Sequence, residues 1–311
     1  MKIEEIKSIL KLNGPRLAYQ SLDGMNWKQI TFNDIKTNID YINSYLIKKD
    51  LVNKNVLSLS SNCIESYILE SLLMDLGSEL SFASQNILLD VQFNMEFDIV
   101  IVDSLEEILD NHILKNVVKD KIVISIANFK KSKEISDLCI SLQNIYKIGL
   151  LSRKDSKERE KELSINFIDK FSIIESNKLK FYSLNDMKNF MKRNEFHFNS
   201  INENEFSTSL YLKKDLFSKS LNLFFLKNKN KFTNNKSVKS LLININEIMP
   251  INLIIDSDSL REIIKLCYVN KVKFSELTGS KIKKIITYNM AAGENLEMLK
   301  NDKIDLVNLN N

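Results

Sequence analysis

The sequence predicts an α/β protein with mixed, largely parallel sheets and helical crossovers. The main observation is that short apolar segments of strand length alternate with longer segments whose apolar residues recur every three or four positions. A second observation is that only six glycines and two prolines occur in 311 residues, which excludes collagen-like and Gly/Pro-rich disordered chains. At 44% hydrophobic residues, the chain has enough apolar material for a sizeable core.

The first part of the chain begins with a helix and a hairpin before strands and helices alternate. Isoleucines and leucines at helical spacing predict the first helix, and a turn at Asp23–Gly24 predicts the hairpin. Gly77 is expected to end the helix that follows the first buried strand. The predicted elements are helices at 1–12, 33–49 (capped by Asn33), 64–76, 104–117 and 132–143, a hairpin at 17–32, and strands at 55–60, 79–82, 98–103, 121–126 and 145–151.

A charge run at 152–162 is predicted to be a linker or an exposed loop. It divides the chain into two expected α/β subdomains, 1–150 and 151–311, the second of which alternates in the same way. Its predicted elements are strands at 169–174, 178–183, 206–212, 251–256 and 284–288, and helices at 185–195, 214–226, 237–248, 258–268 and 294–300.

The charged residues and the cysteines limit which classes of partner and which cellular compartment we expect. The basic residues are 39 Lys and 5 Arg, beside 37 Asn, and Lys is a diffuse, solvated charge where Arg would recognise bases and phosphates. We therefore expect no nucleic-acid partner. Cys63, Cys139 and Cys267 are far apart in apolar runs, which predicts buried thiols in a reducing cytoplasm. With two histidines we expect no histidine-based metal site, and no apolar run is long enough to span a membrane.

Three residue groups allow a functional and a structural interpretation. His197 lies among aromatic residues and is expected to be a surface or packed histidine rather than a catalytic base. Phe224 and Phe225 precede several lysines, a spacing that suits a helix end as well as a platform for stacking bases, and we favour the helix end. Asp256 or Ser257 is expected to cap a helix, which we favour over Mg²⁺ binding by Asp256, Asp258 and Glu262.

Several local patterns together resemble a known superfamily. They are Arg16-Leu17-Ala18-Tyr19 with Asp23-Gly24 and Trp27 to Ile35, Lys54 to Glu65 with Leu72 to Gly77, Ile248 to Ile255, and Lys284 to Leu296. In this order they are similar to the N-terminal domain of the adenylate-forming superfamily, which contains acyl-CoA synthetases and related ligases. The resemblance covers most of the chain and implies that domain's fold, with the C-terminal domain absent.

The resemblance also implies where a nucleotide would bind. In the superfamily a Ser/Thr/Gly-rich loop wraps the ATP phosphates, and its expected place here is Glu175 to Ser183, where Ser176, Lys178 and Lys180 are candidate remnants. Ala291, Ala292 and Gly293 correspond to the loop that lines adenine. ATP and Mg²⁺ are the implied cofactors if the activity survives. Otherwise no cofactor is expected, and the segment after Glu175 is an ordinary tight turn.

The sequence departs from the superfamily at the positions that carry the chemistry. The 175–183 segment contains no glycine, Leu212-Lys213-Lys214 replaces an aromatic-histidine pair, and the chain ends at Asn311, before the expected magnesium, ribose and catalytic-lysine motifs. We therefore assign no catalytic and no metal-binding residue.

These departures predict a non-catalytic accessory subunit in carboxylate activation. Its expected partner is an active synthetase, an acyl carrier protein or a second copy of itself. The alternative is a ligase fragment that forms acyl-adenylates once another chain completes it, and a decaying gene product is a third interpretation.

Overall fold

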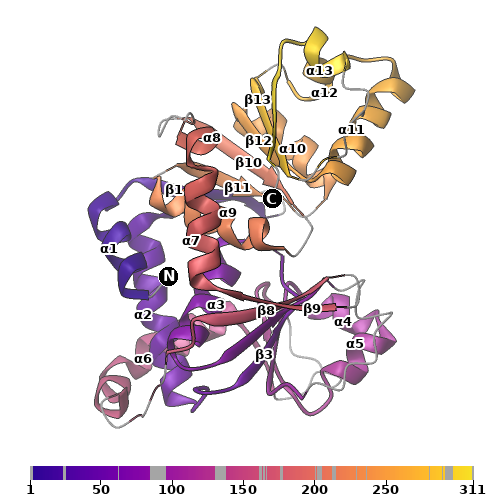
Figure 1. Cartoon of the computed structure of the whole chain (residues 1–311). Coiled ribbons are helices and arrows are strands. Elements are labelled where there is room, and N and C mark those ends of the chain that lie inside the picture. The colour runs from indigo at the N-terminus through magenta and orange to yellow at the C-terminus, as the bar shows by residue number, and fades with distance from the viewer. Residues whose placement is uncertain are drawn as a thin grey trace. The chain divides into compact units, whose positions relative to one another are not determined.

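The computed structural model contains two seven-stranded, largely parallel sheets, and helices connect most of their parallel strands (Figure 1). This arrangement confirms the predicted α/β class with helical crossovers. The structure describes residues 3–23, 26–61, 63–84, 96–129, 138–160, 163, 165, 167–175, 178–199, 201, 205–211, 215–228, 230–235, 237–279, 281–288, 290 and 297–309.

Two compact units make up the chain, and each is assembled from separate segments. The first comprises Met1–Leu12, Asn33–Lys188 and Lys214–Lys219, and the second comprises Asn13–Phe32, Asn189–Lys213 and Ser220–Asn311. The predicted subdomains, 1–150 and 151–311, are contiguous, whereas the segments of these units alternate along the sequence.

The first unit contains a sheet with the strand order β7-β6-β5-β3-β4-β8-β9, parallel except for the final pair. Apolar runs such as Ile99–Val102 are buried on both faces, as expected for a parallel sheet covered by helices. Its strands are β3 (Asn55–Ser58), β4 (Glu79–Phe82), β5 (Ile99–Val102), β6 (Ile122–Ser125), β7 (Cys139–Ser141), β8 (Lys170–Glu175) and β9 (Lys178–Ser183). Its helices are α1 (Ile3–Asn13), α2 (Phe32–Lys48), α3 (Ile64–Asp75), α4 (Leu105–Leu109), α5 (His112–Val117), α6 (Leu142–Glu160) and the start of α7 (Leu184–Arg193).

The second unit contains a sheet with the order β14-β13-β12-β10-β11-β1-β2, in which only β1 and β2 pair antiparallel. Its core lies between the parallel strands and the helices α10 and α11. The strands are β1 (Leu17–Asp23), β2 (Asn26–Thr31), β10 (Phe206–Leu210), β11 (Lys231–Asn234), β12 (Asn252–Ile255), β13 (Lys284–Tyr288) and β14 (Asp305–Leu309). The helices are the end of α7, α8 (Glu195–Asn199), α9 (Leu216–Lys227) from Ser220 onward, α10 (Val238–Ile248), α11 (Ser257–Asn270), α12 (Phe274–Leu277) and α13 (Glu297–Asn301). The first turn of α9, through Lys219, belongs to the first unit.

The structure corrects the prediction around residues 132–162. The predicted helix at 132–143 is wrong at Cys139–Ser141, which forms strand β7, and helix begins only at Leu142. The predicted strand at 145–151 and the predicted linker at 152–162 are also wrong, since α6 continues through both to Glu160. The charged residues of the run are good helix formers, and they continue an α-helix instead of breaking it.

Smaller differences concern element ends and short elements. Helix α2 begins at Phe32, one residue before the predicted cap, and Asn111 divides the predicted helix at 104–117 by capping α5. Four short elements, β11, β14, α8 and α12, each of five residues or fewer, are not predicted from the sequence. The predicted strands at 79–82 and 284–288 are confirmed at both ends.

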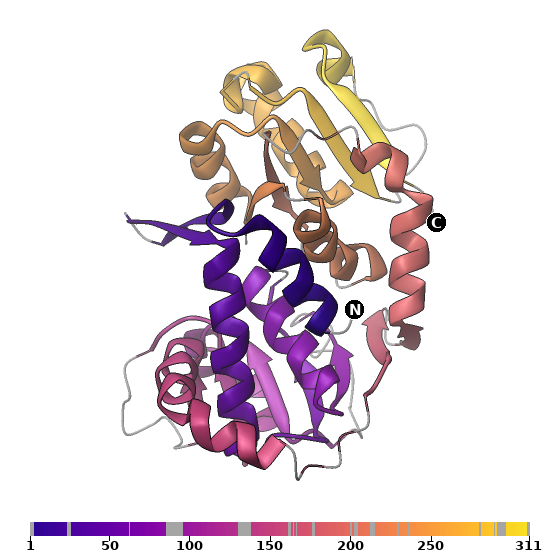
Figure 2. The ribbon, with the colours of Figure 1, turned by 90° about the vertical axis from the view of Figure 1, so that its left-hand side faces the viewer.

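Helices α2 and α6 pack closely because α6 has a glycine at their crossing. A Cβ atom on Gly149 would overlap the carbonyl oxygen of Tyr41 and lie 3.1 Å from the Tyr41 Cα. Helix α1 lies along α2, and Lys7 Nζ is 3.3 Å from Asp40 Oδ1 (Figure 2). Glycine inside a helix costs about 1 kcal/mol relative to alanine, so the close approach explains why it is present in α6.

We predict that Gly149→Ala lowers the free energy of unfolding by about 1–3 kcal/mol, because the overlap with α2 outweighs the better helix propensity of alanine. Urea denaturation measures the change. Lys154→Ala, at an exposed position of the same helix, is the matched control and should change stability by less than about 0.5 kcal/mol. Equal stability of the Gly149 variant and the wild type would show that the helices do not cross this closely.

Candidate functional site

In the first unit, the connections leave strands β3 and β5 in opposite directions. Helix α3 leads from β3 to β4, and α4 and α5 lead from β5 to β6 on the other side of the sheet. Open α/β sheets bind ligands outside the carboxyl ends of such a strand pair. Here Asp103 follows β5 and bonds across to the segment that follows β3. Its Oδ1 accepts hydrogen bonds from Ser61 N (2.9 Å) and Ser61 Oγ (3.0 Å).

Glu70 is a carboxylate buried beside the carboxyl end of β3. Helix α3 is buried on most of its surface, and it directs Glu70 toward two serines that end the strand. Ser58 Oγ donates to Glu70 Oε1 at 2.5 Å, and Ser60 Oγ is 3.4 Å from the same oxygen. A buried carboxylate requires such donors, because each unpaired oxygen would lose its hydration without compensation.

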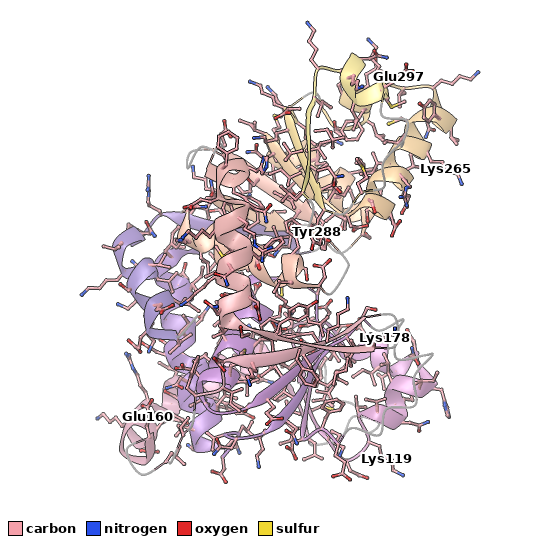
Figure 3. The ribbon with its side chains drawn as sticks, in the orientation of Figure 1. Lys119, Glu160, Lys178, Lys265, Tyr288 and Glu297 are labelled. Carbon is pink, nitrogen blue, oxygen red and sulfur yellow. The ribbon has the colours of Figure 1, made fainter. Side chains whose placement is uncertain are left out.

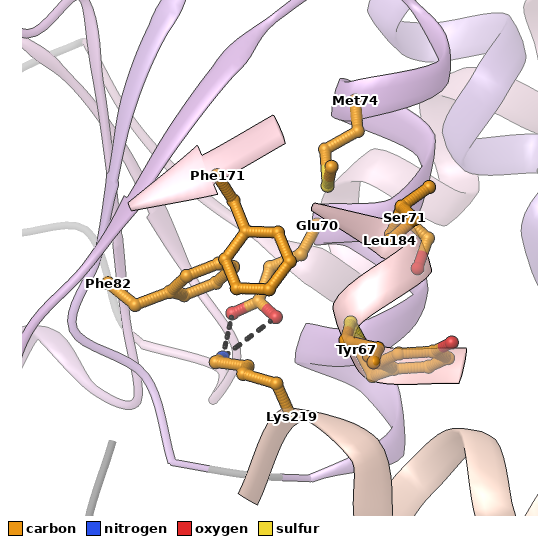
Figure 4. A pocket seen from close by; sticks show the side chains of 9 residues that line it. Tyr67, Glu70, Ser71, Met74, Phe82, Phe171, Leu184 and Lys219 are labelled. Atoms are coloured by element: carbon orange, nitrogen blue, oxygen red, sulfur yellow. Dashed lines mark hydrogen bonds and ion pairs between the residues drawn. The ribbon is translucent and has the colours of Figure 1, made fainter. Parts of the chain in front are cut away.

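Lys219, in the first turn of α9, supplies the opposite charge. Its Nζ lies 3.0 Å from Glu70 Oε2 and 3.2 Å from Oε1 (Figure 4). The ammonium group also stands 3.7 Å from the centre of the Phe82 ring, in cation–π geometry. Asp215 and Ser218 cap the start of this helix, with Ser218 N donating to Asp215 Oδ1 at 2.8 Å.

Neither member of this ion pair is accessible to solvent. The side chains of Lys219 and Glu70 are 5% and 4% exposed. Burial lowers the pKa of Lys219, and the neighbouring Glu70 carboxylate opposes that shift. Burial also raises the pKa of Tyr67, one turn earlier on α3. The two buried side chains therefore balance each other's charge within the fold.

A small pocket adjoins the ion pair. Rings of Phe82, Phe171 and Tyr67 line it together with methionine and leucine side chains (Figure 4). The space open to water is about 30 Å³, which accommodates about two water molecules. It is too small for a carboxylic acid substrate. This pocket can hydrate the ion pair, but it cannot hold a nucleotide.

In the second unit, the corresponding position lies between β10 and β12, whose connections also diverge. Asp256 follows β12 and caps α11, because its Oδ1 accepts from Ser259 N (2.9 Å) and its Oδ2 from Ser259 Oγ (2.9 Å). Of the two predicted caps, Asp256 and Ser257, Asp256 is the one that caps the helix. As in the first unit, the acidic side chain at the strand ends is satisfied by groups of the chain itself.

Amides and hydroxyls form a buried network beside β10 and β11. Asn235 Nδ2 donates to Thr208 Oγ1 and to the Ser209 carbonyl, both at 2.8 Å, and Asn244 Nδ2 donates to Asn235 Oδ1 at 2.5 Å. Asn308 fixes the backbone of Met290, which follows β13, by accepting from its N–H (3.1 Å) and donating to its carbonyl (3.0 Å).

The predicted nucleotide-binding residues fall into two groups. Lys178 and Lys180 lie exposed on β9, where Glu175 of β8 is opposite Lys178 (Figure 3). Ser176, Ala291, Ala292 and Gly293 lie outside the described residues, as does the Leu212-Lys213-Lys214 segment. The assignment of these residues to a nucleotide site stays a prediction.

The other singled-out residues have structural surroundings. His197 is half-buried in α8, and its ring stands edge-on to Phe196. Phe224 and Phe225 are buried in α9, which ends at Lys227, so the interpretation as a helix end is confirmed. Among the cysteines, Cys63 and Cys267 are buried as predicted, whereas Cys139 is half-buried.

Sequence reasoning missed Glu70 and Lys219. The available signal was a charged residue among mostly apolar neighbours within each helix: Glu70 in Ile64–Asp75, which also has Glu65 and Asp75, and Lys219 in Leu216–Lys227, which also has Lys227. Such a charge indicates a buried partner, but the sequence does not say which of many acids and lysines it is.

No three His, Cys, Asp or Glu side chains of the described part of the chain are arranged to hold a metal ion. In the same described ranges, every helix is too short or too polar to cross a membrane.

Comparisons with known proteins place this architecture. No protein-family model and no curated protein matches the sequence. Among solved structures, the luciferase-like enzyme of the mealworm Zophobas morio has a TM-score of 0.66 at 15% identity, covering 97% of this chain and 70% of that one. Acetoacetyl-CoA synthetase from Streptomyces lividans has 0.68 at 9% identity, covering 99% and 50%. The A domain of carboxylic acid reductase from Segniliparus rugosus has 0.67 at 9% identity, covering 99% and 59%.

The chain has the fold of the adenylate-forming enzymes. It spans between 50% and 70% of the lengths of these three proteins. The structural likeness confirms the fold that the sequence resemblance implied. The contacts of Glu70 and Lys219 within this chain explain why both charged side chains can be buried.

We predict that Lys219→Met lowers the free energy of unfolding by about 3–5 kcal/mol, because it leaves the Glu70 carboxylate buried without a counter-charge. Adding Glu70→Leu should recover most of this loss, since Ser58 Oγ and Ser60 Oγ, 3.1 Å apart, can then pair with each other. Urea denaturation of the two single variants and the double variant measures the coupling.

The exposed ion pair between Arg261 and Asp258 is the control for this cycle. Although its atoms are 2.6 Å apart, both side chains are at least half exposed, so Arg261→Ala should cost less than about 1 kcal/mol. Strictly additive losses at Glu70 and Lys219 would mean that the two charges do not interact.

Cys63 is predicted to resist alkylation in the native protein. It caps α3, and a helix N-terminus lowers a thiol pKa, but burial and then the Glu65 and Asp103 carboxylates raise the pKa of Cys63 to about 12. At about pH 8 an ordinary thiol with a pKa of about 8.5 reacts readily. Peptide mapping after iodoacetamide treatment should find Cys139 modified and Cys63 intact, with both modified in urea. Rapid native labelling of Cys63 would contradict this burial.

Proposed function

We propose that the chain is a non-catalytic protein with the adenylate-forming fold, which acts as an accessory, partner-binding subunit in carboxylate activation. The observation that carries the proposal is the β8–β9 hairpin. Glu175 is directly opposite Lys178, so two residues connect the strands where the superfamily resemblance implies a phosphate-wrapping loop. A connection of two residues has fewer backbone amides than a loop that wraps phosphate groups requires.

The starts of helices in each unit support the same conclusion. Phosphate binds at a helix N-terminus because backbone N–H groups there lack partners. Helix α7 follows the hairpin directly, and Asp186 Oδ2 accepts from Ser183 N at 2.7 Å, while Asp186 N donates to Ser183 Oγ. Helices α3, α10 and α11 are capped by Cys63, Ser237 and Asp256 in the same way. A carboxylate at such a position also repels an incoming phosphate.

The partner classes that follow are an active synthetase, an acyl carrier protein or a second copy of the chain. No resident cofactor is proposed. The free cysteines suit a reducing compartment, which we propose is the cytoplasm.

A second candidate function is a ligase fragment that another chain completes. The observation that favours it is the pairing of Asn308 with the Met290 backbone, which fixes the start of the segment that resembles the adenine-lining loop. In that case ATP and Mg²⁺ would be cofactors of the completed enzyme.

We predict that the purified chain catalyses no ATP–pyrophosphate exchange with any member of a panel of carboxylic acids. Saturating MgATP should also leave the melting temperature unchanged, whereas a ligand at about 100 times its Kd would stabilise the fold by about 2.7 kcal/mol. Acid-dependent exchange by the chain alone would overturn the proposal, and Lys178→Ala and Lys180→Ala would then test the two candidate lysines. Exchange that appears only with an added protein chain would support completion by a partner.

A further inference from the structure

A pocket lies beside the amino ends of strands β6 and β7, within the first unit. Its residues come from these two strands, from α6 and from the end of α2, and Ile122 and Cys139 are the first residues of the strands. The space open to water is about 530 Å³, within the range of about 300–1,000 Å³ that small-molecule sites occupy. Because open α/β sheets bind their usual ligands at the carboxyl ends of the strands, this pocket is a separate site.

Half of the residues that line this pocket are aliphatic. They are Leu51, Ile122, Leu138, Ile140 and Ile148. Apolar surface that a ligand buries against them contributes about 25 cal/mol per Å² to binding before the costs of association. The pocket therefore favours a ligand with an apolar body over a small inorganic ion.

Two lysines give the pocket a positive charge. Lys49 follows the last residue of α2, Lys147 lies on α6, and both are exposed. No Asp or Glu is among the residues that line the pocket, and in the described ranges neither ammonium group is paired with a carboxylate. Charges of one sign beside apolar walls attract a ligand of the opposite charge, so the ligand that fits is an anion.

Tyr45 and Asn144 add neutral hydrogen-bond donors. Tyr45 is 5% exposed, and its hydroxyl makes no hydrogen bond with the part of the chain that the structure describes. Burial raises the pKa of Tyr45, so the hydroxyl stays protonated and can donate. A buried tyrosine hydroxyl usually has a partner, and a ligand in the pocket that Tyr45 lines can supply one. Asn144, in the first turn of α6, contributes an exposed side-chain amide.

We propose that this pocket binds a small carboxylate with an apolar body. The ammonium groups of Lys49 and Lys147 balance the single charge, and the Tyr45 hydroxyl and the Asn144 amide donate to the carboxylate oxygens. Phosphate fits less well, since no arginine is among the residues that line the pocket. Strands β7 and β9 are opposite edges of the sheet, so the ligand is held away from the β8–β9 hairpin, and its binding is independent of the accessory role proposed above.

A second pocket, of about 460 Å³, provides the comparison. It lies on the other face of β6, because it is lined by Val123, and residues next to each other in a strand face opposite sides of the sheet. Lys119 also lines it, but Asp120 contributes an opposing charge, and no tyrosine or asparagine is among its lining residues. An exposed lysine there, Lys119, is therefore a matched control for Lys147.

Isothermal titration calorimetry of the full chain with sodium octanoate tests the binding. Octanoate should bind at one site with a millimolar or lower Kd, and octylammonium, which has the same chain and the opposite charge, should not bind. Lys147→Ala should weaken octanoate binding about tenfold, whereas Lys119→Ala should change it less than about twofold. The absence of saturable octanoate binding up to roughly 10 mM, or equal losses in the two lysine variants, would overturn the proposal.

Tyr45→Phe tests the buried hydroxyl separately from the fold. This variant should bind octanoate about threefold more weakly at an unchanged melting temperature, because the hydroxyl has no partner in the described chain to lose. A lower melting temperature with unchanged octanoate affinity would show that the hydroxyl serves the fold and would remove Tyr45 from the site.

Thiol protection tests where the octanoate lies, in a Cys139→Ser background that removes the half-buried native cysteine. Ile148→Cys places a thiol in the wall of the pocket, and saturating octanoate should slow its alkylation by iodoacetamide severalfold. Leu151→Cys is the control on the same helix, since Leu151 is 83% exposed and does not line the pocket, and its alkylation should be unchanged. Octanoate that binds without protecting Ile148→Cys would overturn the assignment to this pocket.

Discussion

Lys219 and Glu70 are charged groups removed from water, and neither can be buried without the other. At 3.0 Å, two unit charges attract each other by about 5 kcal/mol at an effective dielectric constant of 20, which is comparable to the several kcal/mol that each loses in hydration. The pair therefore adds little to the net free energy of unfolding. Its effect is to fix the position at which the two helices meet. The first turn of α9 has to meet α3 at Glu70, beside the end of β3 and over Phe82, because any other position leaves a bare charge.

Most of the fold was predictable because its strands and helices are locally distinct. The apolar runs at β4, β5 and β13 and the helical periodicity of α2 and α11 are strong patterns, and their predicted positions are confirmed. The region of α6 was not predictable from local pattern. Its apolar half contains Gly149, which suggests a break in a helix when read alone, although the glycine is there for the approach of Tyr41. Contacts between distant segments determine such cases.

The candidate site was less predictable than the fold, for a related reason. Asp256 was identified as a cap because the capping pattern is contained within a few residues of one helix. Glu70 and Lys219 are 149 positions apart, so no spacing rule connects them. Lys178 and Lys180 were selected by their resemblance to a phosphate loop, yet what the structure adds is that they lie on an exposed edge strand. These lysines alternate with Leu179 and Phe181, and this period-two pattern already predicts a strand.

Because glycine is scarce in this chain, the positions that keep it indicate where the structure requires it. Met249 and Lys271 end α10 and α11 with positive φ angles of 51° and 53°, positions where glycine is usual and where another residue costs roughly 1–2 kcal/mol. The chain tolerates that cost at helix ends. It keeps Gly149, where any side chain would collide with backbone. A loop that wraps phosphate has the same strict requirement for close backbone approach as the α2–α6 crossing. The absence of glycine between β8 and β9 therefore weighs against phosphate binding more than the low overall glycine content does.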